Sequence, residues 1–553
     1  MNNYKIRDSH EQMCEKIIFK LYEFIDIAGG EMLDKRRVEK IRNQITKEFQ
    51  STPPRNIELV KAYQKLVDEE IIEPNDFVLN HIIKRRVRTL SGIANITVML
   101  KAFGCPGKCI FCPSQPGMPK SYFSNQPAML RAVRNDFNAY MQVKARLNGL
   151  KAQGHDITKI DVRTAGGTWS SYLDDYQEHF IKSIYYALNE GTGEMQDIET
   201  VNQDLENISL EELIEINETA ESRCVGLWIE TRPDWVTKKE LTKLRRFGVT
   251  GIELGIQTTN DEVNEFNERG HGLKESIEAT NLSRQVGLKV CHHLMPNLPK
   301  SNMESDLQTI YDTYKNKGLK PDYIKIYPCM VVPYTKLAEM VKKDPSIYTP
   351  YTDEELYHIL KQTKLIVPRY CRIIRILRDF PSDLVLKGSK KLNMRQLLAK
   401  EGVKCQCVRC REIKGETIEE NDTKINNLVY ETDTGIENFI TVNTIKTDKL
   451  IGLVRLHLPN EEIQNNQFLK ELNGCALIRE LHVYGQQKTL NKNYKLKSHS
   501  QHKGYGKMLM QRAEEEAKGK GFKKIAVISA IGTREYYKKL GYKKIGTYMI
   551  KEI

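Results

Sequence analysis

The sequence predicts an α/β chain in which a parallel-stranded barrel, full or partial, lies between a helical N-terminal region and a smaller α+β domain. Short β-rich runs alternate with helical stretches from about residue 93 to residue 400, and such alternation is typical of a parallel sheet. Before that range apolar residues recur at helical spacing, and after it several strand candidates accompany one long helix. The length of 553 residues also suffices for roughly three or four domains.

Residues 1–90 are expected to be helical. The stretches CEKIIFKLYEFIDIAGG and IELVKAYQKLVDEEII repeat apolar residues every three or four positions, and STPPRN separates them. The stretch KRRVRTLSG, residues 84–92, is a basic connector to the next region.

The barrel is expected over residues 91–400. Its strand candidates are ITVMLKAF, KIDVRTAGGT, CVGLWIETRP, TGIELGIQT, LKVCHHLMP, DYIKIYP and RIIRILRDF. The helices LKESIEATNLSRQVG and ESDLQTIYDTYKNKG lie between them, and each is expected to end at its glycine. Six or seven such units predict a functional site at the carboxyl ends of the strands.

A different pattern follows the barrel. Residues 401–424 form a cysteine-rich junction, and residues 425–553 contain the strand candidates NFITVNT, KLIGLVRLHLP, CALIRELHVYG and KKIAVISAI. The helix GKMLMQRAEEEAKGKG lies between the last two. We expect a compact α+β domain of ~130 residues here.

The composition is that of an ordinary globular protein, with 40% hydrophobic and 28% charged residues. No apolar run approaches the ~20 residues of a membrane span, and the N-terminus lacks the layout of a signal peptide. We therefore expect an intracellular, cytoplasmic protein. Its twelve cysteines are then metal ligands or buried thiols rather than disulfides.

The positive charge is concentrated in one segment. Residues 361–414 contain fifteen Lys/Arg and four Asp/Glu, which gives +11 of the formal net charge of +13. A second basic stretch, 487–507, has six lysines, whereas residues 190–222 have eleven acids and no base. This distribution favours a polyanionic partner, first of all a nucleic acid. The alternative is a set of solvated surface helices and loops.

Three cysteines lie close together in AFGCPGKCIFCPSQPG, with the spacing C-x3-C-x2-C. Thiolates are the usual ligands of iron–sulfur clusters, and a 4Fe–4S cluster normally takes four of them. Cys105, Cys109 and Cys112 would leave one iron free to bind a small molecule. The alternatives are a zinc site, which favours paired C-x2-C ligands, and three unrelated thiols.

The cysteine spacing, after a strand at the start of a barrel, resembles the signature of the radical S-adenosylmethionine (SAM) enzymes. Gly166 and Gly167 in TAGGT resemble the Gly-Gly motif whose backbone binds the amino group of SAM, with Thr168 in place of the usual acidic residue. Glu230 and Arg232 in WIETRPD lie at another strand end, where polar groups could hold the ribose or the carboxylate of SAM.

The C-terminal domain carries Q-x-x-G-x-G, from Gln501 through Gly504 to Gly506, directly before a helix. Backbone amides at a helix N-terminus bind phosphate well. The order strand, glycine-rich turn, helix, strand resembles the acetyl-CoA site of the GCN5-related N-acetyltransferases. Tyr536 and Tyr537 follow the last of these strands, and a tyrosine there can protonate the departing CoA thiolate. The alternatives are a simple turn and two rings that only pack.

Both signatures in one chain resemble the family of the Elongator catalytic subunit and its stand-alone relatives, the tRNA uridine(34) acetyltransferases. Further stretches that resemble this family are MLRAVRNDF, HLMPNLP, RDFPS and RELHVYG. The resemblance implies that a SAM-derived 5′-deoxyadenosyl radical activates acetyl-CoA, whose acetyl carbon adds to C5 of the wobble uridine of tRNA and yields 5-carboxymethyluridine. It assigns Tyr537 to the CoA site, together with the acetyl-CoA contacts Lys159, Glu480, Leu481, His482, Val483, Tyr505, Gly506 and Lys507.

A tRNA, held by its anticodon stem-loop, is the partner that the resemblance implies, and the basic segment between the two domains would contact its phosphates. The residues proposed for these contacts are Arg372, Arg375, Arg378, Lys390, Lys391 and Arg395. Basic residues at 35–42 and 84–88 would add a second contact region.

Cys405, Cys407 and Cys410 form a second dense group, C-x-C-x2-C, which suggests structural zinc with a fourth ligand from elsewhere. Cys329, Cys371 or a histidine are the candidates for that ligand. A second iron–sulfur cluster and three metal-free thiols are the alternatives. The other cysteines, Cys14, Cys224, Cys291 and Cys475, are expected to be small buried residues.

Two features of the sequence depart from the family pattern, and two alternative functions remain open. The short C-x3-C spacing differs from the eukaryotic members and favours a stand-alone prokaryotic type, and the acidic segment 190–222 is expected to be a family-variable insertion. A protein lysine acetyltransferase would use only the C-terminal domain, and an RNA-binding scaffold would use neither cofactor. The partners expected besides tRNA are an electron donor and, if the chain is neither a monomer nor a homodimer, accessory subunits.

Overall fold

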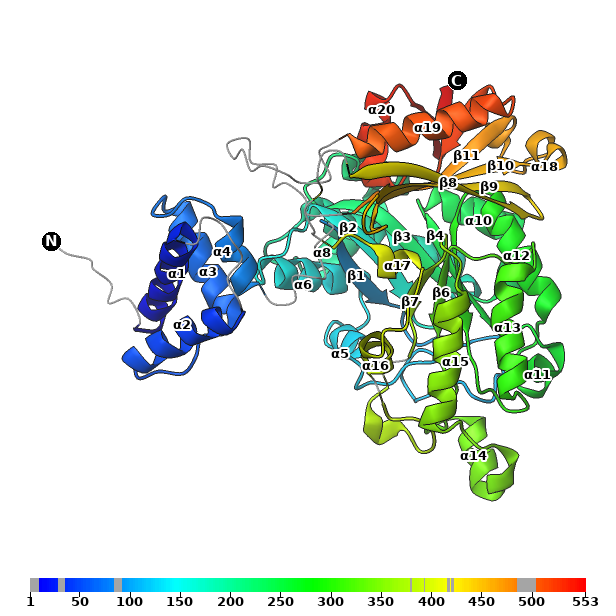
Figure 1. The fold of residues 1–553 in the computed structure, drawn as a ribbon, viewed down its shortest axis with the longest axis horizontal. Coiled ribbons are helices and arrows are strands. Elements are labelled where there is room, and N and C mark those ends of the chain that lie inside the picture. Colours follow the sequence, from blue (N-terminus) through cyan, green and yellow to red (C-terminus); the bar gives the residue numbers. More distant parts are fainter. Residues whose placement is uncertain are drawn as a thin grey trace.

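The computed structural model describes residues 9–27, 35–83, 92–377, 380–391, 393–414, 418, 422–484 and 504–553. Figure 1 shows a small helical group beside a strand-and-helix body, with a second sheet above that body. Within these ranges, each helix is too short or too polar to cross a lipid bilayer.

The N-terminal group contains α1 (Ser9–Ile27), α2 (Lys35–Glu48), α3 (Asn56–Asp68) and α4 (Asp76–Ile82). The prolines of STPPRN fall between α2 and α3, where they end the helical pattern. The apolar faces of the four helices form a core of their own, with Ile17, Leu59, Leu66 and Val78 fully buried. The helical character expected for this region is confirmed.

The central body is a seven-stranded parallel sheet. Its strands are β1 (Ala94–Met99), β2 (Lys159–Ala165), β3 (Arg223–Thr231), β4 (Gly251–Gln257), β5 (Lys289–Leu294), β6 (Tyr323–Ile326) and β7 (Arg372–Arg375). They lie in sequence order, and each pairs in parallel with the next. This order confirms the predicted partial barrel.

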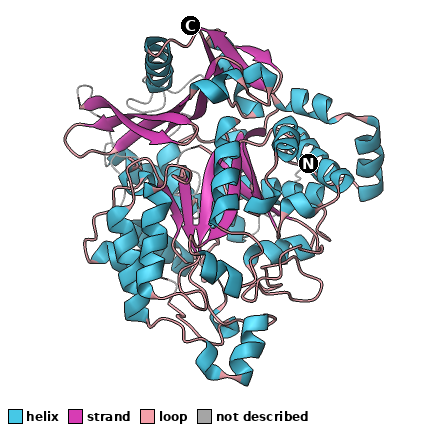
Figure 2. Ribbon diagram, turned by 90° about the vertical axis from the view of Figure 1, so that its right-hand side faces the viewer, coloured by secondary structure: helices cyan, strands magenta, loops and turns pink. Residues whose placement is uncertain are grey.

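Helices cover the outer face of this sheet (Figure 2). The helices of the central body are α5 (Pro127–Val133), α6 (Ala139–Lys151), α7 (Asp174–Glu190), α8 (Ile198–Asn207), α9 (Leu210–Asn217), α10 (Lys238–Arg246), α11 (Asp261–Phe266), α12 (Leu273–Gln285), α13 (Met303–Lys315), α14 (Lys336–Lys343) and α15 (Asp353–Ile366), followed by α16 (Met394–Lys400) and α17 (Val408–Arg411). Of these, α11 and α14 pack against the loop after β1. Gly287 follows α12 in the left-handed conformation (φ +80°), as predicted. The same prediction is wrong for α13, which ends at Lys315 well before Gly318, whose φ is not positive.

The two faces of the barrel strands differ in chemistry. On β2, Ile160 and Val162 point outward and are fully buried under helices, whereas Asp161 and Arg163 point inward and keep side-chain exposures of 16% and 24%. Helix-covered parallel strands are usually apolar on both faces. The interior of this barrel is instead polar and partly open to solvent.

The C-terminal domain is a mixed seven-stranded sheet. Its elements are β8 (Thr423–Thr432), β9 (Gly435–Thr444), β10 (Leu450–Pro459), α18 (Glu461–Asn465), β11 (Cys475–Val483), α19 (Tyr505–Gly519), β12 (Lys524–Val527), α20 (Arg534–Lys539), β13 (Lys543–Ile545) and β14 (Tyr548–Glu552). The strand order is β13-β14-β12-β11-β10-β9-β8, and β11 with β12 is the parallel pair. The four predicted strands are present, and β8, β13 and β14 were not predicted.

The barrel and the C-terminal sheet share one continuous core. Leu477, Ile528 and Tyr548 of the C-terminal domain belong to the same buried cluster as the apolar residues of β2 to β5. The acidic segment 190–222 also contributes, because Glu218 accepts a hydrogen bond from Arg534 at 2.8 Å and both side chains are buried. This segment, which we expected to be a variable insertion, thus contacts the base of α20.

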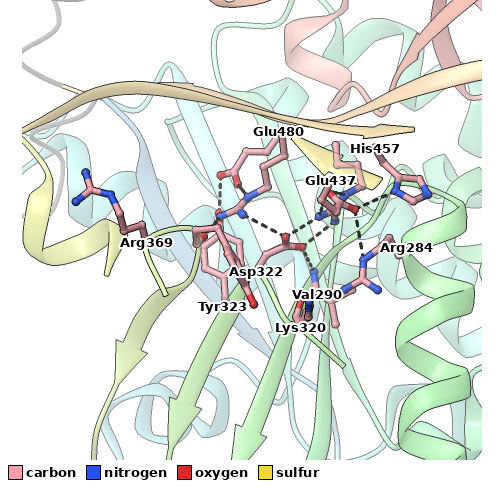
Figure 3. Close-up of polar contacts among 12 residues, drawn as sticks. Arg284, Val290, Lys320, Asp322, Tyr323, Arg369, Glu437, His457 and Glu480 are labelled. Atoms are coloured by element: carbon pink, nitrogen blue, oxygen red, sulfur yellow. Dashed lines mark hydrogen bonds and ion pairs between the residues drawn. The ribbon is translucent and has the colours of Figure 1, made fainter. Parts of the chain in front are cut away.

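Buried ion pairs cross the same interface (Figure 3). The Arg479 guanidinium donates to both carboxylate oxygens of Asp322, at 2.6 and 2.8 Å, and all of these groups are fully buried. Glu437 on β9 lies 3.1 Å from Arg479 and 3.4 Å from Arg284 on α12. Burial alone would raise the pKa of Asp322, but the Arg479 and Arg455 charges hold it well below its usual range. The two domains are therefore joined by charges that neither could bury alone.

Candidate active site

The first cysteine loop, residues 100–126, leaves the carboxyl end of β1 and carries three half-buried thiols. Ile110 and Phe111, between the thiols, are buried against residues of α11 and α14. These two side chains anchor the middle of the loop and leave the cysteines on its surface. The Arg269 guanidinium donates to Cys109 Sγ at 3.0 Å, and Thr168 Oγ1 lies 3.5 Å from Cys105 Sγ.

The three thiols of the first loop are not gathered as closely as the ligands of a single ion would be. Within the part of the chain that the structure describes, two groups of three metal-binding side chains have ligand atoms within 4.8 Å of one another, and the cysteines of the first loop are not among them. In an iron–sulfur cluster each cysteine binds a different iron, so its sulfurs lie farther apart than ligands of a single ion. The residues present therefore fit a three-cysteine cluster.

The residues predicted to bind SAM surround this loop. Gly166 and Gly167 have φ values of +132° and +107°, and a side chain on Gly166 would come within 3.1 Å of the Leu100 backbone. Only glycine allows this close contact between the strand end and the loop. Thr168 is the residue that lies beside Cys105.

Arg232 and Glu230 reach the loop from the end of β3. The Arg232 side chain forms two hydrogen bonds to Asp234, at 2.8 and 2.9 Å, and it packs so closely on Gly107 that a Cβ there would lie 2.2 Å from Nη1. Glu230 accepts a hydrogen bond from the Tyr122 hydroxyl at 3.4 Å. The structure thus gathers all five predicted residues around one loop.

Two residues that were not predicted complete this region. Arg269 and His271, in the NERGH stretch, line an open cavity of about 770 Å³ together with Gly107 and Arg232. Arg269 Nη2 lies 2.7 Å from His271 Nε2, and burial followed by the charge of Arg269 lowers the pKa of His271 to about 3. Nothing in the spacing of the NERGH stretch indicates that Arg269 reaches a cysteine.

The second candidate site lies where β11 and β12 separate. Their last paired residues are Ile478 and Val527, while β11 continues to Val483 against β10 on its other side. The backbone of Glu480 to Val483 is therefore open toward β12, as an extended amide ligand would require. These are the strand residues predicted to contact acetyl-CoA.

The turn predicted to bind phosphate precedes α19. Gly504 adopts the left-handed conformation (φ +79°) and is followed by Tyr505, Gly506 and Lys507 in the first turn of the helix. Free backbone amides and the helix dipole favour an anion at this position. Gln501, predicted for the same site, lies outside the described residues.

The two tyrosines of α20 are not equivalent. Tyr536 is 39% exposed, and its hydroxyl would lie 2.9 Å from a Cβ placed on Gly506. Tyr537 is 6% exposed and packs edge-on against Tyr542, and burial raises its pKa. The hydroxyl that faces the glycine-rich turn therefore belongs to Tyr536.

Lys159, also predicted to contact acetyl-CoA, lies at the N-terminal end of β2, and burial lowers its pKa.

The second cysteine loop, residues 405–410, gathers its thiols closely. The sulfurs of Cys405, Cys407 and Cys410 lie within 4.8 Å of one another. Hydrogen bonds from the Cys405 and Cys410 thiols lower the pKa of Cys407 to about 2. Cys371 lies in the same buried cluster, and its carbonyl accepts a hydrogen bond from Val408, whereas Cys329 belongs to a different cluster below the first loop.

The residues predicted to contact tRNA fall into two groups, those that are exposed and those that bind other groups of this chain. Arg375 and Lys390 are exposed. Arg372 instead pairs with Glu412, and Lys391 pairs with Asp353 at 2.8 Å. Arg395 is half-buried and donates to the Ile373 carbonyl at 3.2 Å. Arg378 and residues 84–88 lie outside the described residues.

Comparisons with protein families agree with this division of the chain. Residues 99–312 match the Radical SAM superfamily, residues 321–403 the Radical_SAM C-terminal domain, and residues 411–542 the Acetyltransferase (GNAT) family. The fold and its two sites thus define a radical SAM barrel joined to a GNAT acetyltransferase domain.

Relatives that span almost the whole chain identify the family. The tRNA uridine(34) acetyltransferase of Methanocaldococcus jannaschii is 40% identical and covers 99% of each chain. Elongator complex protein 3 of Homo sapiens is 33% identical over 89% of this chain and 90% of its own. A solved structure of Methanocaldococcus infernus Elp3, lacking residues 1–46, matches with a TM-score of 0.69 and 36% identity over 84% of this chain and 100% of its own. The chain belongs to this family of Elongator complex protein 3 and the tRNA uridine(34) acetyltransferases.

Proposed function

We propose that this chain converts the wobble uridine of tRNA to 5-carboxymethyluridine, with SAM and acetyl-CoA as co-substrates. The observation that carries this proposal is the presence of two sites on domains that share one continuous core: a loop with three cysteines and a divergence of parallel strands beside a glycine-rich turn. The substrate is inferred from relatives named tRNA uridine(34) acetyltransferase.

A 4Fe–4S cluster on Cys105, Cys109 and Cys112, with bound SAM, would supply a 5′-deoxyadenosyl radical that takes a hydrogen atom from the methyl group of acetyl-CoA. The methyl carbon of the acetyl group would then bond to uridine C5, which would leave an unpaired electron at C6. Loss of the C5 proton and of that electron would restore the uracil ring, and the electron would replace the one used to cleave SAM. The products are methionine, 5′-deoxyadenosine and a thioester, from which water releases CoA. We assign the cradle of SAM to Gly166, Gly167, Thr168, Glu230 and Arg232.

The GNAT domain would bind acetyl-CoA along β11 and on the turn before α19. The open backbone of Glu480, Leu481, His482 and Val483 suits the pantetheine amides, and Tyr505, Gly506 and Lys507 suit the phosphates. We assign Lys159 to the same ligand. We assign Tyr536 to the phosphate end of this site, because its hydroxyl faces the turn, and Tyr537 to proton donation to the CoA sulfur.

The exposed basic residues Arg375 and Lys390 would contact the phosphates of the anticodon stem-loop. We also propose a structural zinc ion on Cys405, Cys407 and Cys410, because three sulfurs within 4.8 Å suit a single tetrahedral ion.

The test is an anaerobic reaction of the reconstituted full chain with SAM, dithionite, acetyl-CoA and tRNA, followed by mass spectrometry of the nucleosides. We expect 5-carboxymethyluridine from the wild type and none from Cys109→Ala. Cys224→Ala, which removes a buried thiol at the start of β3, is the matched control and should keep the product. If cluster-loaded wild type cleaves SAM but leaves uridine unmodified, another acceptor is used and the proposal is wrong.

A further inference from the structure

A charged cluster occupies the barrel interior and includes no cysteine of either loop. Glu253 on β4 accepts hydrogen bonds from Arg163 Nη1 at 2.5 Å, from His293 Nε2 at 2.8 Å and from the Lys325 ammonium. The donors come from β2, β5 and β6, two of which are not neighbours of β4 in the sheet. Side chains from such strands meet only if they point into the curved face, so this cluster lies inside the barrel.

Burying this charged cluster costs more folding free energy than burying apolar side chains in the same place would. Glu253 and His293 are 5% and 6% exposed, and Lys325 is 12% exposed. Paired buried charges are often less stabilising than apolar residues of the same volume. Charges kept inside a barrel at this cost therefore suggest a site that binds something.

Lys325 retains unused hydrogen-bonding capacity. An ammonium group has three N–H donors. Among the described residues, Lys325 donates a hydrogen bond to Glu253 alone. Burial alone would lower the pKa of Lys325, but the Glu253 carboxylate raises it above its usual range. A positively charged donor with free N–H groups thus faces the interior.

The cluster lies between the two cofactor sites. Toward the first cysteine loop, His293 Nδ1 lies 3.7 Å from Glu230, which accepts from Tyr122 of that loop. Toward the GNAT domain, Tyr323 is the preceding inward residue of β6, and its hydroxyl donates to Glu480 at 2.5 Å. An acyl group carried from β11 toward the loop would therefore pass Lys325.

A metal ion does not suit this cluster, although Glu253, Cys291 and His293 have ligand atoms within 4.8 Å. The Glu253 carboxylate already binds two cations, Arg163 and Lys325, which would repel a third. Burial also raises the pKa of the Cys291 thiol well above its usual range, which opposes the thiolate that a metal requires. The free donors of the cluster favour a neutral oxygen acceptor instead.

We propose that Lys325 binds the carbonyl oxygen of the acetyl thioester inside the barrel, and that Glu253 holds the Lys325 ammonium in position. This assignment rests on the proposed use of acetyl-CoA. A cationic donor on that oxygen would fix the acyl group between the strand that binds CoA and the loop that carries the cysteines. Lys325 is then a substrate-binding residue, and Glu253 is a positioning residue.

The test compares two ligands that differ by the acyl group. Isothermal titration calorimetry of the full chain, without cluster reconstitution, gives the Kd of acetyl-CoA and of CoA, which lacks the carbonyl. A hydrogen bond to a charged group contributes enough for a roughly tenfold change in Kd. We expect Lys325→Met to raise the Kd of acetyl-CoA about tenfold and that of CoA less than twofold, and Lys325→Arg to restore part of the difference.

The matched control is Lys144→Met, which removes a buried lysine paired with Glu190 at 2.9 Å on the outer side of the barrel. It should change neither Kd. Glu253→Gln should weaken acetyl-CoA selectively, since Lys325 keeps its charge but loses its position, and circular dichroism checks that each variant is folded. Equal effects of Lys325→Met on both ligands, or no effect on either, overturn the proposal. Failure of the wild type to bind acetyl-CoA would instead overturn the proposed function.

Discussion

The two cysteine loops of this chain contain the same number of thiols in nearly the same spacing, but the structure arranges them differently. In the first loop the three thiols are half-buried and do not gather within 4.8 Å, and Cys109 accepts a hydrogen bond from Arg269. In the second loop the sulfurs converge within 4.8 Å, with Cys407 fully buried. The difference teaches that cysteine count and spacing define metal binding only roughly, since the packing between the cysteines decides whether a cluster or one ion fits.

The largest expected effect is on SAM cleavage, which should depend on the first cysteine loop and not on the second. Cys112→Ala should abolish formation of 5′-deoxyadenosine and lower the iron content, because a cluster ligand is lost. Cys410→Ala, the matched change in the second loop, should leave both quantities near wild type. Iron analysis and chromatography of the anaerobic reaction measure them, and loss of SAM cleavage in both variants would contradict the comparison.

The second loop is expected to determine stability instead. Cys407→Ala removes a ligand from the proposed zinc site and a buried side chain from the surrounding core, so the midpoint of thermal unfolding should fall by roughly 5 °C. A chelator strong enough to remove zinc should lower the wild-type midpoint similarly and have little effect on the variant. Zinc analysis of the purified wild type is the direct check, and protein without zinc would make this interpretation wrong.

Arg269 tests whether the first loop depends on its surroundings. Arg269→Gln removes the hydrogen bond to Cys109, and such bonds make a cluster easier to reduce. The variant should retain iron, have a more negative reduction potential, and cleave SAM roughly tenfold more slowly. A potentiometric titration followed by electron paramagnetic resonance measures the potential. An unchanged potential would show that Arg269 acts on another group.

The smallest effect concerns the packing beneath the first loop. Asp306 accepts hydrogen bonds from the backbone N–H of Asn297 at 2.6 Å and from the Tyr351 hydroxyl at 2.7 Å, and burial raises its pKa to about 6. The folded state then holds a proton that the unfolded state releases near pH 4. Stability should therefore fall as the pH rises from 4 to 6, by no more than about 3 kcal/mol.

The Asp306→Asn variant has no carboxyl group to titrate at this position. Its unfolding midpoint temperature should therefore fall less between pH 4 and pH 6 than that of the wild type. Thermal unfolding at a series of pH values measures the difference. Parallel curves for the two proteins would show that Asp306 is ionised throughout.

The strand–helix alternation was sufficient to predict the barrel, because each buried strand has a continuous apolar face. Strand β8 was missed because it is an edge strand with many exposed and polar residues, and β13 and β14 are short. The positions of Gly166 and Glu230 around the first loop followed from their places at strand ends.

Contacts between distant segments could not be predicted in the same way. Arg372 was proposed as a phosphate contact, yet Glu412, forty residues later, neutralises it. The cluster around Glu253 draws single residues from four strands, and none of these strands carries a spacing that identifies it. Only the curvature of the sheet brings them together.

The ion pairs between the barrel and the GNAT sheet limit how this chain can change during evolution. A split of the gene near residue 415 would give one product with Asp322 buried and unpaired and another with Arg479 in the same condition. Each product would have to find the other before it could fold fully. The pair is therefore expected to be inherited, synthesised and degraded as one unit.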